Sequence, residues 1–71
     1  MSTDIRIEFG NRVRGLRKQR GLTQMDLAIG LGVGRSYLSQ VERGLRDPGL
    51  RLVKSIADAL SMPLSKLFEG L

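Results

Sequence analysis

The segment 23–43 constrains the fold most, because it predicts two short helices joined by a tight turn. Apolar residues in its first half recur at helical spacing and form one face. They are Leu27, Ala28 and Leu31. Thr23 is a candidate N-cap, and Asp26 stands in the first turn, where a negative charge suits the helix dipole. Gly32 permits the positive φ that the turn needs.

The second half of this segment, from Arg35 to about Arg43, predicts a helix with two different faces. Leu38 and Val41 lie on one side, where they would hold the helix against a core. The opposite side carries hydrogen-bonding side chains, namely Arg35, Ser36, Ser39, Gln40 and Arg43. A helix with one pinned face and one polar face is suited to enter a DNA major groove, with its N-terminal residues nearest the base edges.

The remaining sequence predicts three more helices, at about 5–20, 50–60 and 64–69. No stretch alternates with the period of a strand, so we expect an all-α, compact five-helix domain over residues 1–71, with its core at about 9–68. Gly10 and Gly15 lie inside the first helix, and each costs roughly 1 kcal/mol relative to alanine. The early part of that helix is therefore expected to fray.

The composition limits how so short a chain can be stabilised and what chemistry it can perform. A chain of 71 residues is marginal alone, and such domains often use disulfides, metals or a partner subunit. The sequence has no cysteine and no histidine, so no disulfide, metal site or cofactor is expected. An enzyme is disfavoured for the same reason, and because no carboxylates are paired at a useful spacing.

The charge indicates an anionic partner. Lysine and arginine number 12 against 7 acids, which gives a net charge of +5. Charge alone leaves nucleic acid and an anionic membrane surface open. We expect the basic residues of the first helix to form a solvated helix face rather than a binding site. These residues are Arg12, Arg14, Lys18 and Arg20. The apolar stripes and turns disfavour the membrane. No apolar run approaches a membrane span, and residues 1–5 lack a signal-peptide pattern, so a cytoplasmic location is expected.

At this point the chain resembles the phage repressor and Cro-like helix-turn-helix family, also called XRE-like. The matching residues are Leu16-Arg17, Gly21-Leu22-Thr23-Gln24, Leu27-Ala28, Leu31-Gly32-Val33, Tyr37 to Gly44, Pro48, and Leu64 with Leu67-Phe68. The resemblance implies a lambda-repressor-like DNA-binding fold in a bacterial or phage-encoded protein. One departure is Gly34, where the family usually has Ser or Thr; glycine is an acceptable cap, but a hydroxyl that could touch phosphate is lost.

The resemblance also implies roles for individual residues. The side chains expected to contact bases are Arg35, Ser36, Ser39 and Gln40, with Arg35 suited to a bidentate contact with guanine. Those expected to contact phosphates are Thr23, Gln24, Tyr37, Arg43 and Arg46. Arg17 and Glu42 are expected to form a structural ion pair that joins the first helix to the third. The alternative places Arg17 on DNA with its basic neighbours.

One such module touches few base pairs, so the resemblance implies a homodimer on a pseudo-palindromic operator, with half-sites about one helical turn apart. The predicted dimer interface is Leu60, Met62, Leu64, Leu67 and Phe68. We favour an autoregulatory controller of a restriction–modification system, which can activate as well as repress. A Cro-like repressor, an antitoxin-type regulator, and a protein-interaction module on the same fold are the alternatives. No small-molecule effector and no membrane partner are expected.

Overall fold

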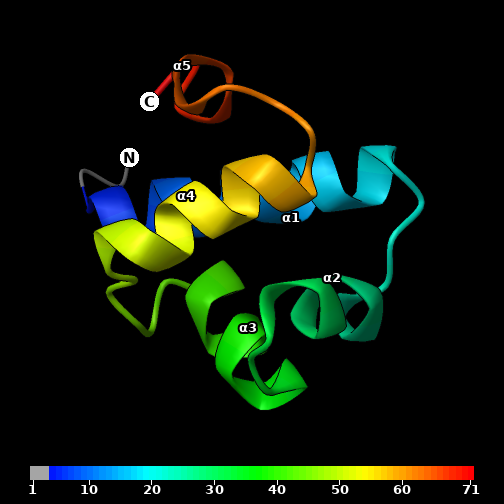
Figure 1. Ribbon diagram of the computed structural model, residues 1–71. Coiled ribbons are helices and arrows are strands. Elements are labelled where there is room, and N and C mark those ends of the chain that lie inside the picture. Colours follow the sequence, from blue (N-terminus) through cyan, green and yellow to red (C-terminus); the bar gives the residue numbers. More distant parts are fainter. Residues whose placement is uncertain (1–3) are drawn as a thin grey trace.

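The computed structural model describes residues 4–71, which form five α-helices and no strand (Figure 1). In chain order they are α1 (Ile5–Gln19), α2 (Gln24–Leu31), α3 (Arg35–Glu42), α4 (Leu50–Ala59) and α5 (Leu64–Leu67). The prediction of an all-helical, five-helix fold is confirmed. The last helix is a single turn, shorter than the predicted 64–69. Residues 1–3, part of the N-terminal segment considered for a signal peptide, lie outside the described residues.

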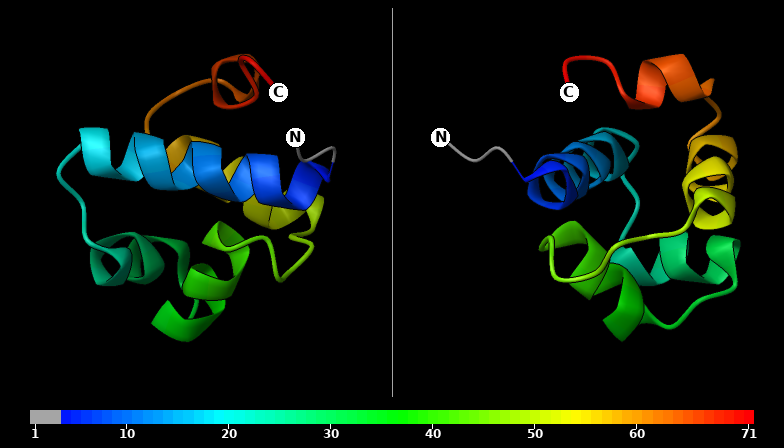
Figure 2. Two further views of the ribbon diagram at one scale, coloured as in Figure 1. Left: turned by 180° about the vertical axis from the view of Figure 1, so that it is seen from behind. Right: turned by 90° about the vertical axis from the view of Figure 1, so that its left-hand side faces the viewer.

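The helices form three layers. α2 and α3 lie on one side of α1 and α4, and α5 lies on the other side (Figures 1 and 2). Residues from every helix meet in a single apolar core. Its buried members are Phe9, Val13, Leu16, Leu27, Ala28, Leu38, Val41, Val53, Ile56, Ala57, Leu60, Met62 and Leu67. The face of α3 opposite this core is therefore directed away from α5.

The caps of α2 explain where it begins and ends. The Thr23 hydroxyl oxygen accepts from the Asp26 amide at 3.0 Å, and the Asp26 carboxylate accepts from the Thr23 amide at 2.9 Å. This reciprocal pair is a capping box, and the bond from the Thr23 amide, followed by one from its side chain, lowers the pKa of Asp26. Gly32 ends the helix with φ 70°, in the left-handed region predicted for the turn.

Part of the predicted dimer interface lies inside the protein. Leu60 and Leu67 are 0% exposed and Met62 is 9% exposed, because α4 and α5 turn these side chains into the core of their own chain. Assigning them to a dimer interface was wrong, since an interior side chain has no surface to offer a second copy. Leu64 and Phe68 remain exposed at 40% and 38%. Only these two of the five stay available for self-association.

Gly10 is a point of close helix approach rather than a site of fraying. It is buried, and a β-carbon placed on it would lie 2.5 Å from the carbonyl oxygens of Val41 and Glu42. Such a distance is shorter than real contacts allow, so only glycine lets α1 come this close to the end of α3. The expected fraying of α1 is therefore wrong at this position, and α1 begins at Ile5. Gly15 has open space where its side chain would stand.

A buried ion pair joins α1 to α3. Arg17 Nε donates to Glu42 Oε2 at 2.7 Å and Arg17 Nη2 donates to Glu42 Oε1 at 3.0 Å, with both side chains less than a tenth exposed. Arg17 Nη1 donates to the Leu22 carbonyl at 2.8 Å, and Gln24 Nε2 donates to Glu42 Oε1 at 3.0 Å. The hydrogen bond to Glu42 raises the pKa of Arg17. Each charge is thus paired and hydrogen-bonded where it is buried.

Arg12 of α1 and Arg20 at its C-cap bind the ends of other helices, which corrects the prediction that they are only solvated side chains. Arg12 donates to the carbonyls of Lys66 and Leu67 at 2.8 and 3.2 Å, and Arg20 donates to the carbonyl of Leu60 at 2.8 Å. The last carbonyls of a helix lack intrahelical partners and carry partial negative charge. α1 therefore holds the C-terminal ends of both α4 and α5.

We expect Gly10→Ala to destabilise the protein by at least about 2 kcal/mol, because backbone atoms of α3 cannot yield to a methyl group. Gly15→Ala is the matched control on the same helix and should stabilise by up to ~1 kcal/mol. Urea denaturation followed by circular dichroism measures both changes. Equal effects of the two substitutions would contradict the close approach at Gly10.

Arg17→Ala should cost about 3–5 kcal/mol of stability, because it leaves the Glu42 carboxylate buried without its cation. The control is Lys54→Ala, which breaks an exposed pair with Asp58 at 2.7 Å and should cost less than ~1 kcal/mol. Thermal and urea unfolding provide the measurement. An Arg17→Ala protein with wild-type stability but weak DNA binding would instead place Arg17 on DNA.

Candidate nucleic-acid interface

The outer face of α3 presents free polar side chains to solvent. Leu38, Val41 and Glu42 are buried and fix the helix by its inner face. Arg35 and Ser36 are exposed at the start of the helix, and Ser39 is half-buried one turn later. Within residues 4–71, the side chains of these last three make no hydrogen bond or ion pair, so their bonding groups are available to a ligand. We call Arg35, Ser36, Ser39 and Gln40 the α3 face.

The start of α3 is capped by its backbone alone. Gly34 occupies the N-cap with φ −72° and ψ 149° and offers no side-chain bond to the helix. This φ and ψ are accessible to any residue, so the glycine is not required by backbone geometry. The hydroxyl that the family usually carries here is absent, as its sequence indicated. The polar side chains at the start of α3 are therefore those of Arg35 and Ser36.

A second group of polar residues surrounds the end of α3. Arg46 Nε donates to Gln40 Oε1 at 2.7 Å, and Arg46 Cζ lies 5.5 Å from the centroid of the Tyr37 ring. The structure thus brings together two residues expected to contact phosphate and one expected to contact a base. Arg43 is exposed beside them. Gln40 belongs to the α3 face, and through it the other three residues adjoin that face.

Gln24 lies where α1, α2 and α3 meet. It is half-buried and bonded to Glu42, and it lines a polar hollow. The hollow is lined by Arg14, Arg17, Gln24, Glu42 and Arg43. Because Glu42 is engaged by Arg17, the exposed Arg14 and Arg43 give this hollow its positive charge. Arg14 was not among the predicted contacts; its spacing of three from Arg17 on a helix is the signal that places it on this side.

Thr23 is committed to the capping box at the start of α2, on the same side of the molecule. Both its amide and its hydroxyl oxygen take part in that box. Contact between Thr23 and a phosphate would be an additional role and stays a prediction. The residues predicted to contact DNA therefore lie around α3 and the start of α2. For Thr23, the structure shows only its role in capping α2.

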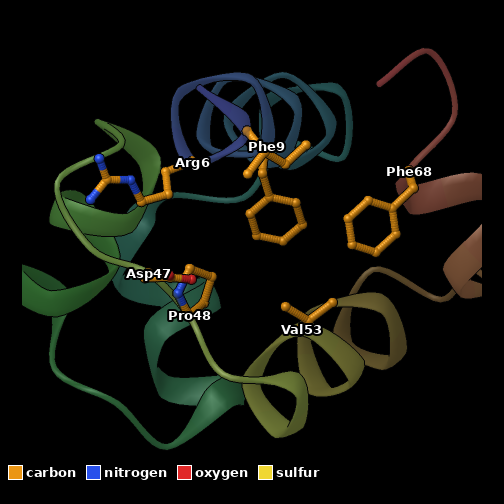
Figure 3. Close-up of a pocket in the computed structure, with 7 residues that line it drawn as sticks. Arg6, Phe9, Asp47, Pro48, Val53 and Phe68 are labelled. Carbon is orange, nitrogen blue, oxygen red and sulfur yellow. The ribbon is translucent and has the colours of Figure 1, made fainter. Parts of the chain in front are cut away.

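A separate apolar hollow of about 150 Å³ lies between α1, α4 and the end of α5, beside the loop that precedes α4 (Figure 3). Its walls are Ile5, Phe9, Pro48, Val53 and Phe68, with Arg6 and Asp47 at the rim. The rings of Phe9 and Phe68 stack with their centroids 5.4 Å apart and their planes at 27°. Phe68 therefore packs against the core residue Phe9 and also forms part of an exposed apolar surface.

None of the helices in residues 4–71 is both long and apolar enough to cross a membrane. In the same part of the chain, no group of three or more acidic, histidine or cysteine side chains could hold a metal ion.

Comparison with known proteins assigns the family. The family described as "Helix-turn-helix domain" matches residues 8–67. The control protein C.MunI of a Mycoplasma species is 36% identical over 69 residues, which cover 96% of this chain and 93% of that protein. The immunity repressor protein of Bacillus phage phi105 is 38% identical over 58 residues, which cover 82% of this chain but 40% of the repressor.

A solved structure of a controller protein is also similar to this chain. The restriction-modification controller protein C.AhdI from Aeromonas hydrophila superposes with a TM-score of 0.84 at 42% identity, covering 87% of this chain and 94% of that one. The match therefore extends over nearly the whole length of a small regulator and is not confined to the segment around α2 and α3. The chain belongs to the helix-turn-helix family of DNA-binding transcription regulators, which is not a family of enzymes.

Proposed function

We propose that this protein binds a pseudo-palindromic DNA operator as a homodimer and thereby controls transcription, including that of its own gene. The observation that carries the proposal is the α3 face, whose Arg35, Ser36 and Ser39 side chains are unpartnered in the described structure. Arginine and hydroxyl side chains at the start of such a helix suit the acceptors and donors of base edges in the major groove. We infer that it acts in the cytoplasm of a bacterium.

Positive charge around the α3 face supports contact with the DNA backbone. Arg43 and Arg46 are exposed next to α3, and Arg14 and Arg43 border the hollow at Gln24. Two of the neighbouring acids are engaged within the fold, since Asp26 caps α2 and Glu42 pairs with Arg17. The unneutralised arginines would supply the sequence-independent attraction to phosphates that dominates DNA affinity. Contacts of Thr23, Gln24 and Tyr37 with phosphates remain part of this proposal.

Among regulators, we favour a restriction–modification controller. The chain matches C.MunI and C.AhdI over more than nine-tenths of their lengths, whereas it matches less than half of the phage immunity repressor. The similarity to these two controller proteins, at 36% and 42% identity, supports the controller subtype. A Cro-like or antitoxin-type regulator is the second candidate.

The apolar hollow between α1, α4 and α5 is our proposed dimer surface. Leu64 and Phe68 are exposed near it, and Leu50 stands 89% exposed at the first position of α4, between the lining residues Pro48 and Val53. A two-fold interface places the same patch on both copies. Of the two charged residues on its rim, Arg6 is paired with Asp4 of the same chain at 2.7 Å, so the apolar residues carry the proposed contact.

Selection from a random DNA pool should return a two-fold symmetric motif, because each copy of the dimer presents one α3 face. On the selected duplex, Arg35→Ala should weaken binding by about 5- to 150-fold, while Lys54→Ala on α4 is the control for lost charge. Fluorescence anisotropy measures both. Affinity should also fall by about 10³–10⁵ between about 50 and 200 mM salt. A pool without an enriched sequence would refute specific recognition.

Leu50→Glu should raise the dimer dissociation constant by at least about tenfold, because burying a carboxylate against an apolar partner surface is costly. Ile29→Glu is the matched control, since Ile29 is 71% exposed on α2, away from the hollow. Sedimentation equilibrium over a concentration series compares the two. A wild-type protein that stays monomeric at high micromolar concentration would rule out the dimer.

A further inference from the structure

The turn after α3 places Arg46 over the α3 face. Gly44 adopts φ 75°, the Gly44 amide donates to the Val41 carbonyl at 3.1 Å, and the Leu45 amide donates to the Gln40 carbonyl at 2.9 Å. These bonds form a Schellman motif, which reverses the chain at the end of a helix. A β-carbon on Gly44 would lie 2.7 Å from Ile7, so α1 also fixes this turn. The position of Arg46 is thus set by the fold.

Arg46 is held by two side chains of α3 that stand three residues apart and share one face. Its guanidinium lies 5.5 Å from the Tyr37 ring centroid, a favourable cation–π distance, and its Nε donates to Gln40 Oε1 at 2.7 Å. Tyr37 is half-buried and packs against the core, so it provides a firm support. The bond from Arg46 defines the orientation of the Gln40 amide: the oxygen faces Arg46, and the NH₂ group makes no hydrogen bond within residues 4–71.

This orientation changes what Gln40 can recognise. A free glutamine pairs with adenine by donating to N7 while its oxygen accepts from the N6 amino group. In this protein the oxygen already accepts from Arg46, and an adenine amino group would have to approach it beside a positive guanidinium. The NH₂ group remains a donor, and guanine O6 and N7 and thymine O4 accept from it without bringing an amino group of the same base edge towards Arg46. Adenine N7 can accept as well, but it brings the adenine amino group beside the guanidinium, which disfavours adenine.

We propose that Arg46 is a specificity-determining residue, which locks Gln40 as a hydrogen-bond donor so that it selects a keto base, guanine or thymine, against adenine. This inference rests on the proposed function, because it assumes that the α3 face lies in the major groove. Arg46 acts through Gln40 in this role, in addition to any contact of its own with phosphate.

The test is a double-mutant cycle in which the measured quantity is the preference of each variant for one base over another. At the operator position that responds to Gln40→Ala, affinities for guanine, thymine and adenine duplexes are measured for the wild type, Arg46→Ala, Gln40→Ala and the double variant. We expect the wild type to favour a keto base by about tenfold. Arg46→Ala should weaken all duplexes and also bring that preference to about one or reverse it towards adenine. In the Gln40→Ala background, the Arg46 substitution should leave the preference unchanged.

Arg46→Lys is the conservative control, because its ammonium can still donate to Gln40 Oε1 and should keep part of the keto preference. If Arg46→Ala lowers affinity equally for every base, Arg46 serves only phosphate and the inference is overturned. The same conclusion follows if no operator position responds to Gln40→Ala while a motif is still selected. If no motif is selected at all, the proposed function fails and the inference with it.

Discussion

The ion pair between Arg17 and Glu42 is the interaction on which the arrangement of α1, α2 and α3 depends. It lies where three helices meet, and through the Leu22 carbonyl and Gln24 it reaches the start of α2 as well as the end of α3. A buried pair adds little stability by itself, but one partner without the other is costly. The pair therefore favours the observed arrangement of α1, α2 and α3, in which both charges are paired.

The close approach at Gly10 and the turn at Gly44 complete that arrangement. Both glycines face the contact between α1 and the end of α3, one beneath the carbonyls of Val41 and Glu42 and the other against Ile7. They allow backbone to lie on backbone, which brings Arg17 within reach of Glu42. α3 is thus positioned by α1, which contributes few of the proposed DNA contacts. On the outer face of α3, the side chains of Arg35, Ser36 and Ser39 make no hydrogen bond or ion pair within residues 4–71.

Much of this could be predicted from the sequence, because local patterns report local structure. Helical periodicity predicted α2 and α3, Thr23 and Asp26 predicted the start of α2, and Gly32 predicted the turn between the two helices. The polar face of α3 was predicted as the side opposite its apolar residues. Contacts between distant segments left no such pattern. Nothing local shows that Gly10 faces a carbonyl, that Arg12 and Arg20 bind helix ends, or that Arg46 returns to Gln40. A leucine also looks the same whether it fills the core, as Leu60 and Leu67 do, or faces a partner.

The single-turn helix α5 has a consequence for how the protein opens. A helix of four residues has no stability of its own in water, so its order comes from Leu67 in the core and from Arg12 on its carbonyls. Such a segment lies at the low end of local unfolding free energies. Its amides are expected to exchange with solvent before those of α1 or α3. When α5 unfolds, Phe68 moves away and the apolar hollow loses one of its lining residues. Warming would therefore change the association state of the protein while the helices around Arg17 are still folded.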